Sequence, residues 1–561
     1  MPQLGFPAPL TAPRPAWPRR RTHPVVGRRG MMAAAHPLIA STGLNVLRRG
    51  GNAVDAAVAA ALTAAVVMPE MCGLGGDLFA IVHPGPGAGE PLAFLGSGAA
   101  PAEASLAMVR ARAERGADGT PRMPLRGGLS ISTPGMVDGY RALLARFGSR
   151  PFGELAEDAI RLADEGAPLS PLAAHVMSLF REVLASHTAT AAVFLPGGGP
   201  PAPGALLPQR DLAATLRTLA REGPEAFYQG ALAGRIAAGV QAAGGALTEG
   251  DLARHATTVE APLSTTYRGR TVLQTGLPSQ GFILLEALNI VEHAPTAMLA
   301  RGDAEALHLM AEALKRAYAD RLAHARDPAA GPTPLERLLA KPYAAEAFAR
   351  IDPARASDAP APALQDGDTT YLCAVDADGM MVSLIQSVSS AFGSGVVAGG
   401  TGVLMNNRAG RGFELDPASP NLYAPGRKTM HTLNCWLLLD EADVPVVVGG
   451  TPGGDGQPQW GLQLVSGLID GGLDVQLASE APRWQVWPGT DPHDRPNPCR
   501  LQIETRIGEA VLEGLDAKGH RIERLPGWAG QGAAQLIARD PATGVLMGGS
   551  DPRVEGLALG W

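Results

Sequence analysis

The pattern of apolar and polar positions changes character about two thirds of the way along the chain. Residues 51–67 are an Ala/Val-rich run opened by Asn52, which predicts a capped, buried helix. Residues 133–147 carry apolar side chains at helical spacing, and residues 151–260 contain several more segments of that kind. Between these helices, glycines at 71–76 lead into an apolar run that predicts a strand. We therefore expect the first part to be mainly helical with some strands.

The middle of the chain continues this mixture and then loses its periodicity. Residues 261–275 alternate around Arg268-Gly269 like paired strands, and two helical segments follow at 278–293 and 304–325. Residues 352–368 are rich in Pro, Ala and Asp and show no period, which predicts a flexible linker.

The last third, residues 369–561, is rich in strands. Two apolar runs flank Asp378-Gly379, the strongest short signal for a hairpin turn. Further apolar runs, TGVLMNN, TLNCWLLLD and VPVVVGG, predict more strands. The chain thus divides into a leader at 1–30, a mixed part at 31–368 that ends in the linker, and a strand-rich part at 369–561.

Composition and charge exclude several classes of function. With 46% hydrophobic and 18% charged residues, the 561-residue chain is an ordered globular protein. A net charge of −7 offers no basic footprint for nucleic acid. The four cysteines include no C-x-x-C pair and the twelve histidines do not cluster, so we expect no metal and no cofactor. The Pro/Arg-rich leader lacks an apolar segment, so we expect it to be mobile and the protein to be cytoplasmic, without membrane contact.

Two stretches carry residue types suited to catalysis. In DGDTTYL, Thr369 follows the linker at the mouth of a predicted strand. If the Asp368–Thr369 bond were cut, the new α-amine could act as the base for the Thr369 hydroxyl. Its pKa of about 7.7–8.0 lies near the working pH. The alternative is that threonine stands there only because it favours strands.

The second stretch is the glycine-rich segment GTPGGDGQ at 450–457, which follows an apolar run. Without Cβ atoms, Gly453 and Gly454 could direct paired N–H groups at an oxyanion. The alternative here is an ordinary glycine turn.

Taken together, the motifs resemble those of the gamma-glutamyltransferase family of N-terminal-nucleophile hydrolases. The resemblance runs from MMAAAHPLIASTGLNVLRRGGNAVDAAVAAAL (31–62) through GLGGDLF, STPGMVDGY, PSQG and DTTYLCAVDADG to FGSGVVAGGTGVLMNNR (392–408) and GTPGGDGQ. It implies an α+β fold, a four-layer αββα sandwich, and self-cleavage into a large and a small chain. A homodimer of such processed pairs is one assembly that it allows.

The resemblance also implies roles for particular residues. Thr369 would be the nucleophile released by cleavage after Asp368, and Gly453 and Gly454 would form the oxyanion hole. Ser387 stands where the family usually has a second threonine that hydrogen-bonds the nucleophile.

The part of the motif set that grips the substrate differs from that of gamma-glutamyl enzymes. Ser97 replaces the arginine that holds the substrate α-carboxylate, and the family's Ser-Ser pair falls at about Met430 and His431. The residues that would receive the substrate ammonium fall near Ser389, Arg408 and Arg411. A unit-charge contact at 4 Å and an effective dielectric of 20 amounts to about 4 kcal/mol, so these arginines would repel an ammonium. They would favour a carboxylate.

We therefore expect a self-processing threonine amidohydrolase, closer to the amidohydrolase and acylase branch of the family. Its substrate would be a small amide bearing a short anionic acyl group of the oxamate, oxalyl or glutaryl type. Arg408, His431 and Arg411 would bind the acyl carboxylate, with Ser389 and Asn407 beside them. Two alternatives are a gamma-glutamyltransferase or glutathione hydrolase with a rearranged clamp, and a non-catalytic relative that keeps the fold for binding.

Overall fold

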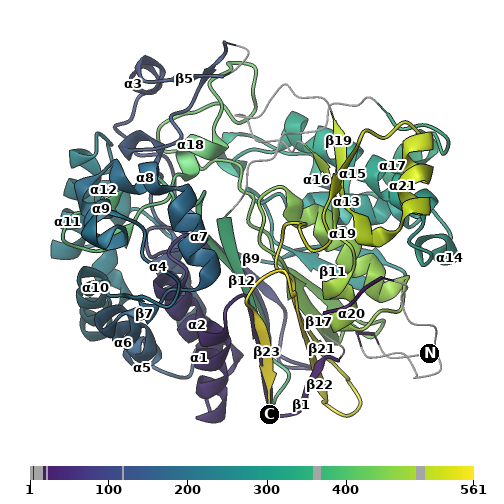
Figure 1. Ribbon diagram of the computed structural model, residues 1–561, viewed down its shortest axis with the longest axis horizontal. Coiled ribbons are helices and arrows are strands. Elements are labelled where there is room, and N and C mark those ends of the chain that lie inside the picture. The colour runs from purple at the N-terminus through teal and green to yellow at the C-terminus, as the bar shows by residue number, and fades with distance from the viewer. Residues whose placement is uncertain (1–3, 6–16, 21–22, 117–118, 358–367, 488–498) are drawn as a thin grey trace.

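Two stacked sheets with helices on both outer faces form the molecule, which confirms the predicted αββα sandwich (Figure 1). The computed structural model describes residues 4–5, 17–20, 23–116, 119–357, 368–487 and 499–561.

Each sheet has seven strands, and all neighbours within it are antiparallel. The sheet that contains Thr369, here the threonine sheet, runs in the order β23 (Leu557–Gly560), β2 (Gly30–Ala34), β12 (Asp368–Asp376), β13 (Met381–Ser389), β3 (Asp77–His83), β4 (Leu92–Gly96), β9 (Thr258–Glu260). The second, here the glycine sheet, runs β1 (Val25–Gly27), β22 (Leu546–Ser550), β21 (Gln535–Arg539), β17 (Pro445–Gly450), β16 (Trp436–Leu439), β11 (Arg270–Gln274), β10 (Leu263–Tyr267).

The apolar runs of the central strands are continuous because both of their faces are buried. In β12, Tyr371, Cys373 and Val375 point into the core between the sheets. The alternate residues Leu372 and Ala374 point into the core beneath the outer helices. Alternate residues of β12 therefore pack into two different cores, as expected for a strand that is covered on both faces.

Helices from different parts of the chain cover the two outer faces (Figure 1). Those in the core of the threonine sheet include α1 (Pro37–Arg48), α2 (Ala53–Val67), α4 (Met136–Phe147), α6 (Glu157–Glu165), α10 (Arg210–Glu222) and α11 (Ala231–Ala242). Those in the core of the glycine sheet include α13 (Phe282–Val291), α15 (Ala304–His324), α17 (Lys341–Ala349), α19 (Gly456–Ile469), α20 (Val475–Glu480) and α21 (Glu509–Ala517). A small mixed sheet of β18 (Trp484–Trp487), β19 (Arg500–Glu504) and β20 (Ile522–Leu525) lies beside the second group.

Most predicted elements are present with the expected ends. Asn52 caps α2 by accepting hydrogen bonds from the amides of Val54 and Asp55, and Asp378-Gly379 joins β12 to β13. The run TGVLMNN was expected to be a full strand, but only β15 (Val403–Leu404) forms, paired with β14 (Val397–Ala398).

The leader and the linker differ from their predicted description. Strand β1 already begins at Val25, before the expected boundary at residue 30. Arg20, in the leader that was expected to be mobile, donates from its backbone to Glu480 at 3.0 Å and from its guanidinium to the Pro552 carbonyl at 3.1 Å. The start of the linker is also held, since Ser357 contacts both Glu312 and Lys315. Most of the remaining linker lies outside the described residues.

Candidate active site

Thr369 lies at the start of β12, opposite an irregularity in β13. Asp368 pairs with Ser389 and Thr370 with Gln386, so β13 carries one extra residue at this point. Such a bulge re-aims side chains, and the Thr369 hydroxyl donates to the Ser387 hydroxyl at 3.2 Å. Ser387 also accepts from the Ser389 amide at 2.7 Å. The predicted nucleophile and its predicted hydroxyl partner are therefore in contact, in a site where Thr369 is buried.

The glycine loop, residues 451–455, directly follows strand β17, and the last residue of β17 packs on β12 near Thr369. A Cβ on Gly450 would lie 2.4 Å from the ring of Tyr371, two residues beyond Thr369. The loop then turns through Gly453 and Gly454, whose φ angles of 124° and 52° favour glycine. The two predicted oxyanion glycines thus adopt conformations that only glycine reaches without strain, close to the start of β12.

Side chains from three directions hold the carbonyl side of the glycine loop. Gln280 donates to the carbonyl of Gly454 at 2.8 Å. Arg321 of α15 forms a buried ion pair with Asp455 at 2.5 Å. The ring of Trp460 lies so close beneath the loop that a Cβ on Gly453 would approach it to 2.1 Å. These contacts leave the loop little freedom to move.

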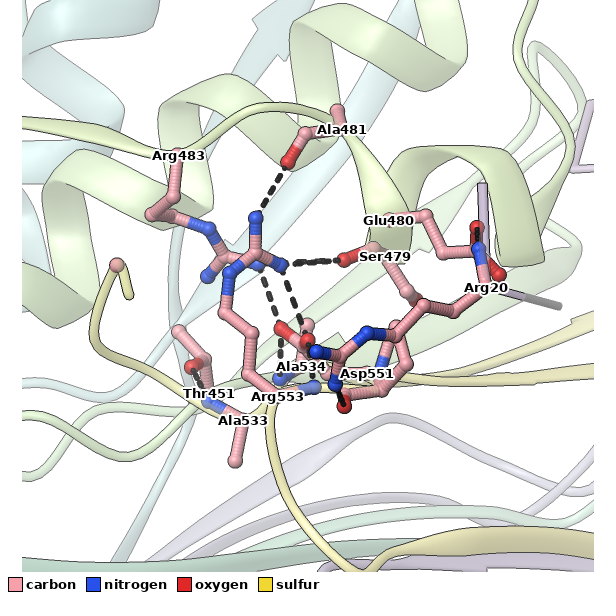
Figure 2. A network of polar contacts seen from close by, with 12 residues as sticks. Arg20, Thr451, Ser479, Glu480, Ala481, Arg483, Ala533, Ala534, Asp551 and Arg553 are labelled. Atoms are coloured by element: carbon pink, nitrogen blue, oxygen red, sulfur yellow. Dashed lines mark hydrogen bonds and ion pairs between the residues drawn. The ribbon is translucent and has the colours of Figure 1, made fainter. Parts of the chain in front are cut away.

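A buried ionic network supports the other side of the glycine loop (Figure 2). Thr451 accepts from the Ala533 amide at 3.0 Å, and the neighbouring Ala534 amide donates to Asp551 at 3.3 Å. Arg483 donates to the same carboxylate at 2.7 Å and lies over the Trp460 ring, 5.5 Å from its centroid. Burial lowers the pKa of Arg483 to about 10, which leaves it cationic at neutral pH. Sequence reasoning missed this network, because its members come from four separated segments.

The two predicted arginines lie in the short helix α18 (Arg408–Gly412). Arg408 and Arg411 are only 2% and 3% exposed, so neither points to solvent. Arg411 donates to the carbonyl of Ser389 at 2.7 Å. Since Ser389 donates to Ser387 and Ser387 accepts from Thr369, three hydrogen bonds connect this guanidinium to the nucleophile.

Asp77 is a site residue that the sequence reasoning missed. It pairs with Ser387 across β3 and β13, so Thr369, Ser387 and Asp77 lie on three consecutive strands. Its carboxylate lies 3.5 Å from Arg408 Nε and 3.0 Å from His431 Nε2. The only signal was the acidic residue that follows the glycines of GLGGDLF, a stretch that was interpreted as a loop leading into a strand. We call Asp77, Arg408, Arg411 and His431 the basic cluster.

His431 contributes a neutral donor to the basic cluster. The Leu433 amide donates to its Nδ1 at 3.1 Å, so the ring proton lies on Nε2 and is donated to Asp77. Burial, followed by the charge of Arg408, lowers the pKa of His431 to about 4. Two guanidinium groups and one carboxylate give the cluster a formal charge of +1, smaller than the two arginines alone would suggest.

The remaining predicted substrate contacts behave differently from one another. The hydroxyls of Ser389 and Ser97 are buried and have no hydrogen-bond partner among the described residues. Ser389 also has a φ of 89°, which is strained for a residue with a Cβ. Asn407 is a correction: its amide bonds Ser390 and the Leu125 carbonyl, so it holds the loop together rather than facing a substrate.

The expectation that no histidines cluster is also wrong. Within the described ranges, His308, Glu312 and His520 place their ligand-type atoms within 4.8 Å of one another. As for the membrane, none of the helices described here is both long and apolar enough to cross a bilayer. The cytoplasmic location stays a prediction.

Comparisons with known proteins identify the family of the chain. A sequence profile of the family described as Gamma-glutamyltranspeptidase matches residues 39–561. The Glutathione hydrolase-like YwrD proenzyme of Bacillus subtilis (strain 168) is 36% identical over 96% of this chain and 99% of its own. The Oxamate amidohydrolase proenzyme of Klebsiella pneumoniae (strain ATCC 700721 / MGH 78578) is 37% identical over the same shares. The crystal structure of cephalosporin acylase from Bacillus halodurans superposes with a TM-score of 0.88 at 34% identity and covers 99% of both chains.

Proposed function

Since the chain belongs to the gamma-glutamyltranspeptidase family of hydrolase proenzymes, we propose that it acts as a member of the acylase and amidohydrolase branch, that Thr369 is its nucleophile and that its substrates carry a short anionic acyl group. The observation that carries the substrate class is the pair of buried arginines, of which Arg411 is connected through Ser389 and Ser387 to Thr369 and Arg408 lies 3.5 Å from Asp77.

The first proposed step is self-cleavage. The Thr369 hydroxyl attacks the carbonyl carbon of Asp368, the amide nitrogen leaves as the α-amine of Thr369, and water hydrolyses the resulting ester. Two products follow, a large chain that ends at Asp368 and a small chain of residues 369–561. Ser387 positions the hydroxyl, because its own hydroxyl accepts a hydrogen bond from that of Thr369 at 3.2 Å before cleavage.

The same hydroxyl then attacks the substrate. The new α-amine takes its proton and returns it to the leaving amine, while the N–H groups of Gly453 and Gly454 stabilise the oxyanion. Water resolves the acyl-enzyme and releases the anionic acid. The rigid support of the glycine loop keeps these donors in place without reorganisation during the reaction.

The basic cluster selects the acyl group. Neighbouring strands lie about 4.8 Å apart, which places the backbone of Asp77, two strands away, roughly 10 Å from the backbone of Thr369. A short dicarboxylic acyl group spans that gap once the arginine side chains reach towards it. Arginine binds a carboxylate through two parallel N–H donors, which fixes both charge and orientation.

A second candidate is hydrolysis of gamma-glutamyl compounds, and one observation favours it. Asp77 Oδ1 is buried and accepts no hydrogen bond from the described residues, so this oxygen could receive the substrate ammonium. The neighbouring Arg408 opposes such binding by Coulomb repulsion.

Trapping the acyl-enzyme tests the proposal. Processed protein is mixed with glutaryl-p-nitroanilide, quenched in acid within the first turnovers, digested and analysed by mass spectrometry. We expect one glutaryl group on the peptide that begins at Thr369. Acylation at any other residue, or turnover without processing at Asp368–Thr369, would refute Thr369 as the nucleophile.

A further inference from the structure

A second group of polar side chains lies well away from Thr369, where α15 meets the segment after α21. His308 and Glu312 stand one turn apart on α15, and His520 reaches them from the turn before β20. All three are buried, with exposures of 2%, 6% and 5%. His308 precedes Arg321 of the glycine loop support by more than three turns of the same helix, which is about 20 Å along its axis.

The hydrogen bonds of His308 leave one lone pair directed at its partner. Its Nε2 lies 2.8 Å from the carbonyl oxygen of Asp352. Because a carbonyl only accepts, the ring proton lies on Nε2 and Nδ1 carries the lone pair. That Nδ1 is 2.9 Å from Nε2 of His520. A histidine that donates its far N–H to a backbone carbonyl is the arrangement that orients metal-binding imidazoles.

The carboxylate of Glu312 is oriented in the same manner. Lys315 donates to Oε1 at 2.7 Å, and the Ser357 amide donates to Oε2 at 3.2 Å. Lys315 is itself fixed by the carbonyl of Ser357 at 2.9 Å. The carboxylate is thus held close to the two imidazoles by groups that would form the outer shell of a metal site.

We propose that His308 Nδ1, His520 Nε2 and a Glu312 carboxylate oxygen bind one Zn²⁺ ion. Two imidazoles and a carboxylate are a common zinc donor set, and the charge of Lys315 disfavours the harder cations that need several carboxylates. With Zn–N bonds of about 2.0–2.1 Å, nitrogens 2.9 Å apart subtend about 90° at the ion. Opening that separation to roughly 3.3 Å gives tetrahedral geometry.

Binding has an identifiable cost. The ion replaces the hydrogen bond between the imidazoles, and His520 must carry its proton on Nδ1 instead of Nε2. A cavity of about 410 Å³, lined in part by Glu312, Lys315, Asp352 and Ser357, adjoins the group. It gives the ion a route of entry and room for a water as the fourth ligand.

The position of the group gives the ion a structural role. His308 and Glu312 precede Thr369 in the chain and His520 follows it. If the proposed cleavage occurs, the site joins the large chain to the small chain. The existence of the site does not depend on the proposed function, but this consequence does. Other contacts already form the same seam, including the Lys518–Glu305 ion pair at 2.8 Å and the hydrogen bond from Ala356 to the Lys518 carbonyl at 2.7 Å.

Equilibrium dialysis of untagged protein against Zn²⁺, followed by elemental analysis, tests the proposal. We expect one zinc per chain in the wild type and none in His308→Ala or His520→Gln. The glutamine variant keeps an N–H donor for His308 and so preserves the metal-free hydrogen bond. His175→Ala is the matched control, because His175 is exposed on α7 (Pro171–Leu179), and it should bind like the wild type.

A second measurement separates metal binding from folding. Zinc should raise the urea midpoint for unfolding of the wild type by at least 0.5 M and leave that of His520→Gln unchanged. Wild-type protein that binds less than 0.2 zinc per chain would overturn the proposal, as would His520→Gln protein that binds as much as the wild type. Both results can be read whether or not the protein turns over any substrate.

Discussion

The glycine loop and the basic cluster serve the same threonine in the proposed mechanism, but their polar groups are paired to different degrees. Gln280, Arg321 and Thr451, which contact the glycine loop or belong to it, each have buried partners. The atoms Trp460 Nε1 and Arg483 Nη1, which have no hydrogen-bond partner among the described residues, lie in the layer that supports the loop. In and beside the basic cluster, Asp77 Oδ1 and the hydroxyls of Ser389 and Ser97 are buried without hydrogen bonds to described residues. Unpartnered buried polar atoms are costly and uncommon in folded proteins.

This contrast separates the two tasks of the site. Donors for an oxyanion work best when they are fixed before the reaction, and the contacts of the glycine loop satisfy that requirement. A recognition site can instead leave polar groups for the ligand to complete, so that a substrate lacking the matching group leaves them unpaired. Under the proposed function, the first region determines the reaction and the second determines which acyl group undergoes it.

Replacement of the nucleophile should have the largest effect. Thr369→Ala removes the hydroxyl that both regions serve, so we expect one uncut chain of 57.8 kDa and no turnover. Thr370→Val is the control, since Thr370 is buried beside it and valine keeps its shape. A denaturing gel with mass spectrometry gives the result. Cleavage at residue 369 in the alanine variant would contradict the account.

A methyl group in the glycine loop should have the next largest effect. In Gly453→Ala the new Cβ would meet the Trp460 ring at 2.1 Å, at a φ of 124°. Displacement of one oxyanion donor lowers kcat by about 10²–10³. Gly472→Ala is the matched control, because Gly472 also has a positive φ, of 60°, but faces open space. Equal kcat losses in the two variants would attribute the effect to backbone strain alone.

Loss of an arginine from the basic cluster should impair binding more than chemistry. For Arg411→Ala we expect KM for glutaryl-p-nitroanilide to rise about 10–100-fold, with Arg411→Lys in between because lysine cannot form the bidentate contact. The measurement is steady-state kinetics on processed protein. A fall in kcat at constant KM would assign Arg411 to the reaction and remove the distinction between the two regions.

Neutralising the acidic member should act in the opposite direction. Asp77→Asn keeps the shape and raises the formal charge of the cluster from +1 to +2. We expect KM for glutaryl-p-nitroanilide to fall about three- to tenfold and any turnover of γ-glutamyl-p-nitroanilide to be lost, since each tenfold corresponds to about 1.4 kcal/mol. Improved γ-glutamyl turnover in this variant would show that Asp77 does not receive an ammonium.

The smallest expected effect is that of pH on anion binding. Burial lowers the pKa of His431 to about 4, so between pH 7 and 5 the imidazole stays neutral and the arginines alone carry the positive charge. KM for the anionic substrate should therefore change less than twofold over that range. A KM that falls tenfold as pH drops through 6.5 would show that an imidazolium binds the substrate. The same shift affects folding: protonation of the unfolded chain below pH 6.5 removes stability until the folded-state pKa near 4 is passed.

The fold was predictable because its signals are local or periodic. Asn52 begins α2, Asp378-Gly379 turns the hairpin, and Thr369 stands at a strand mouth as expected. The missed features are all long-range. Asp77 joins the site because β3 pairs with β13, more than 300 residues later. His308 contacts His520, which lies 212 residues later in the chain. No local sequence pattern indicates this contact or the pairing that brings Asp77 to the site.

The central claim is that the basic cluster selects an anionic acyl group without an ammonium. Glutaryl-p-nitroanilide and γ-glutamyl-p-nitroanilide differ by that one ammonium, so the ratio of their kcat/KM values on processed enzyme tests the claim most directly. We predict a ratio of at least 10 in favour of the glutaryl substrate. A ratio below 1 would contradict the account and establish a gamma-glutamyl enzyme.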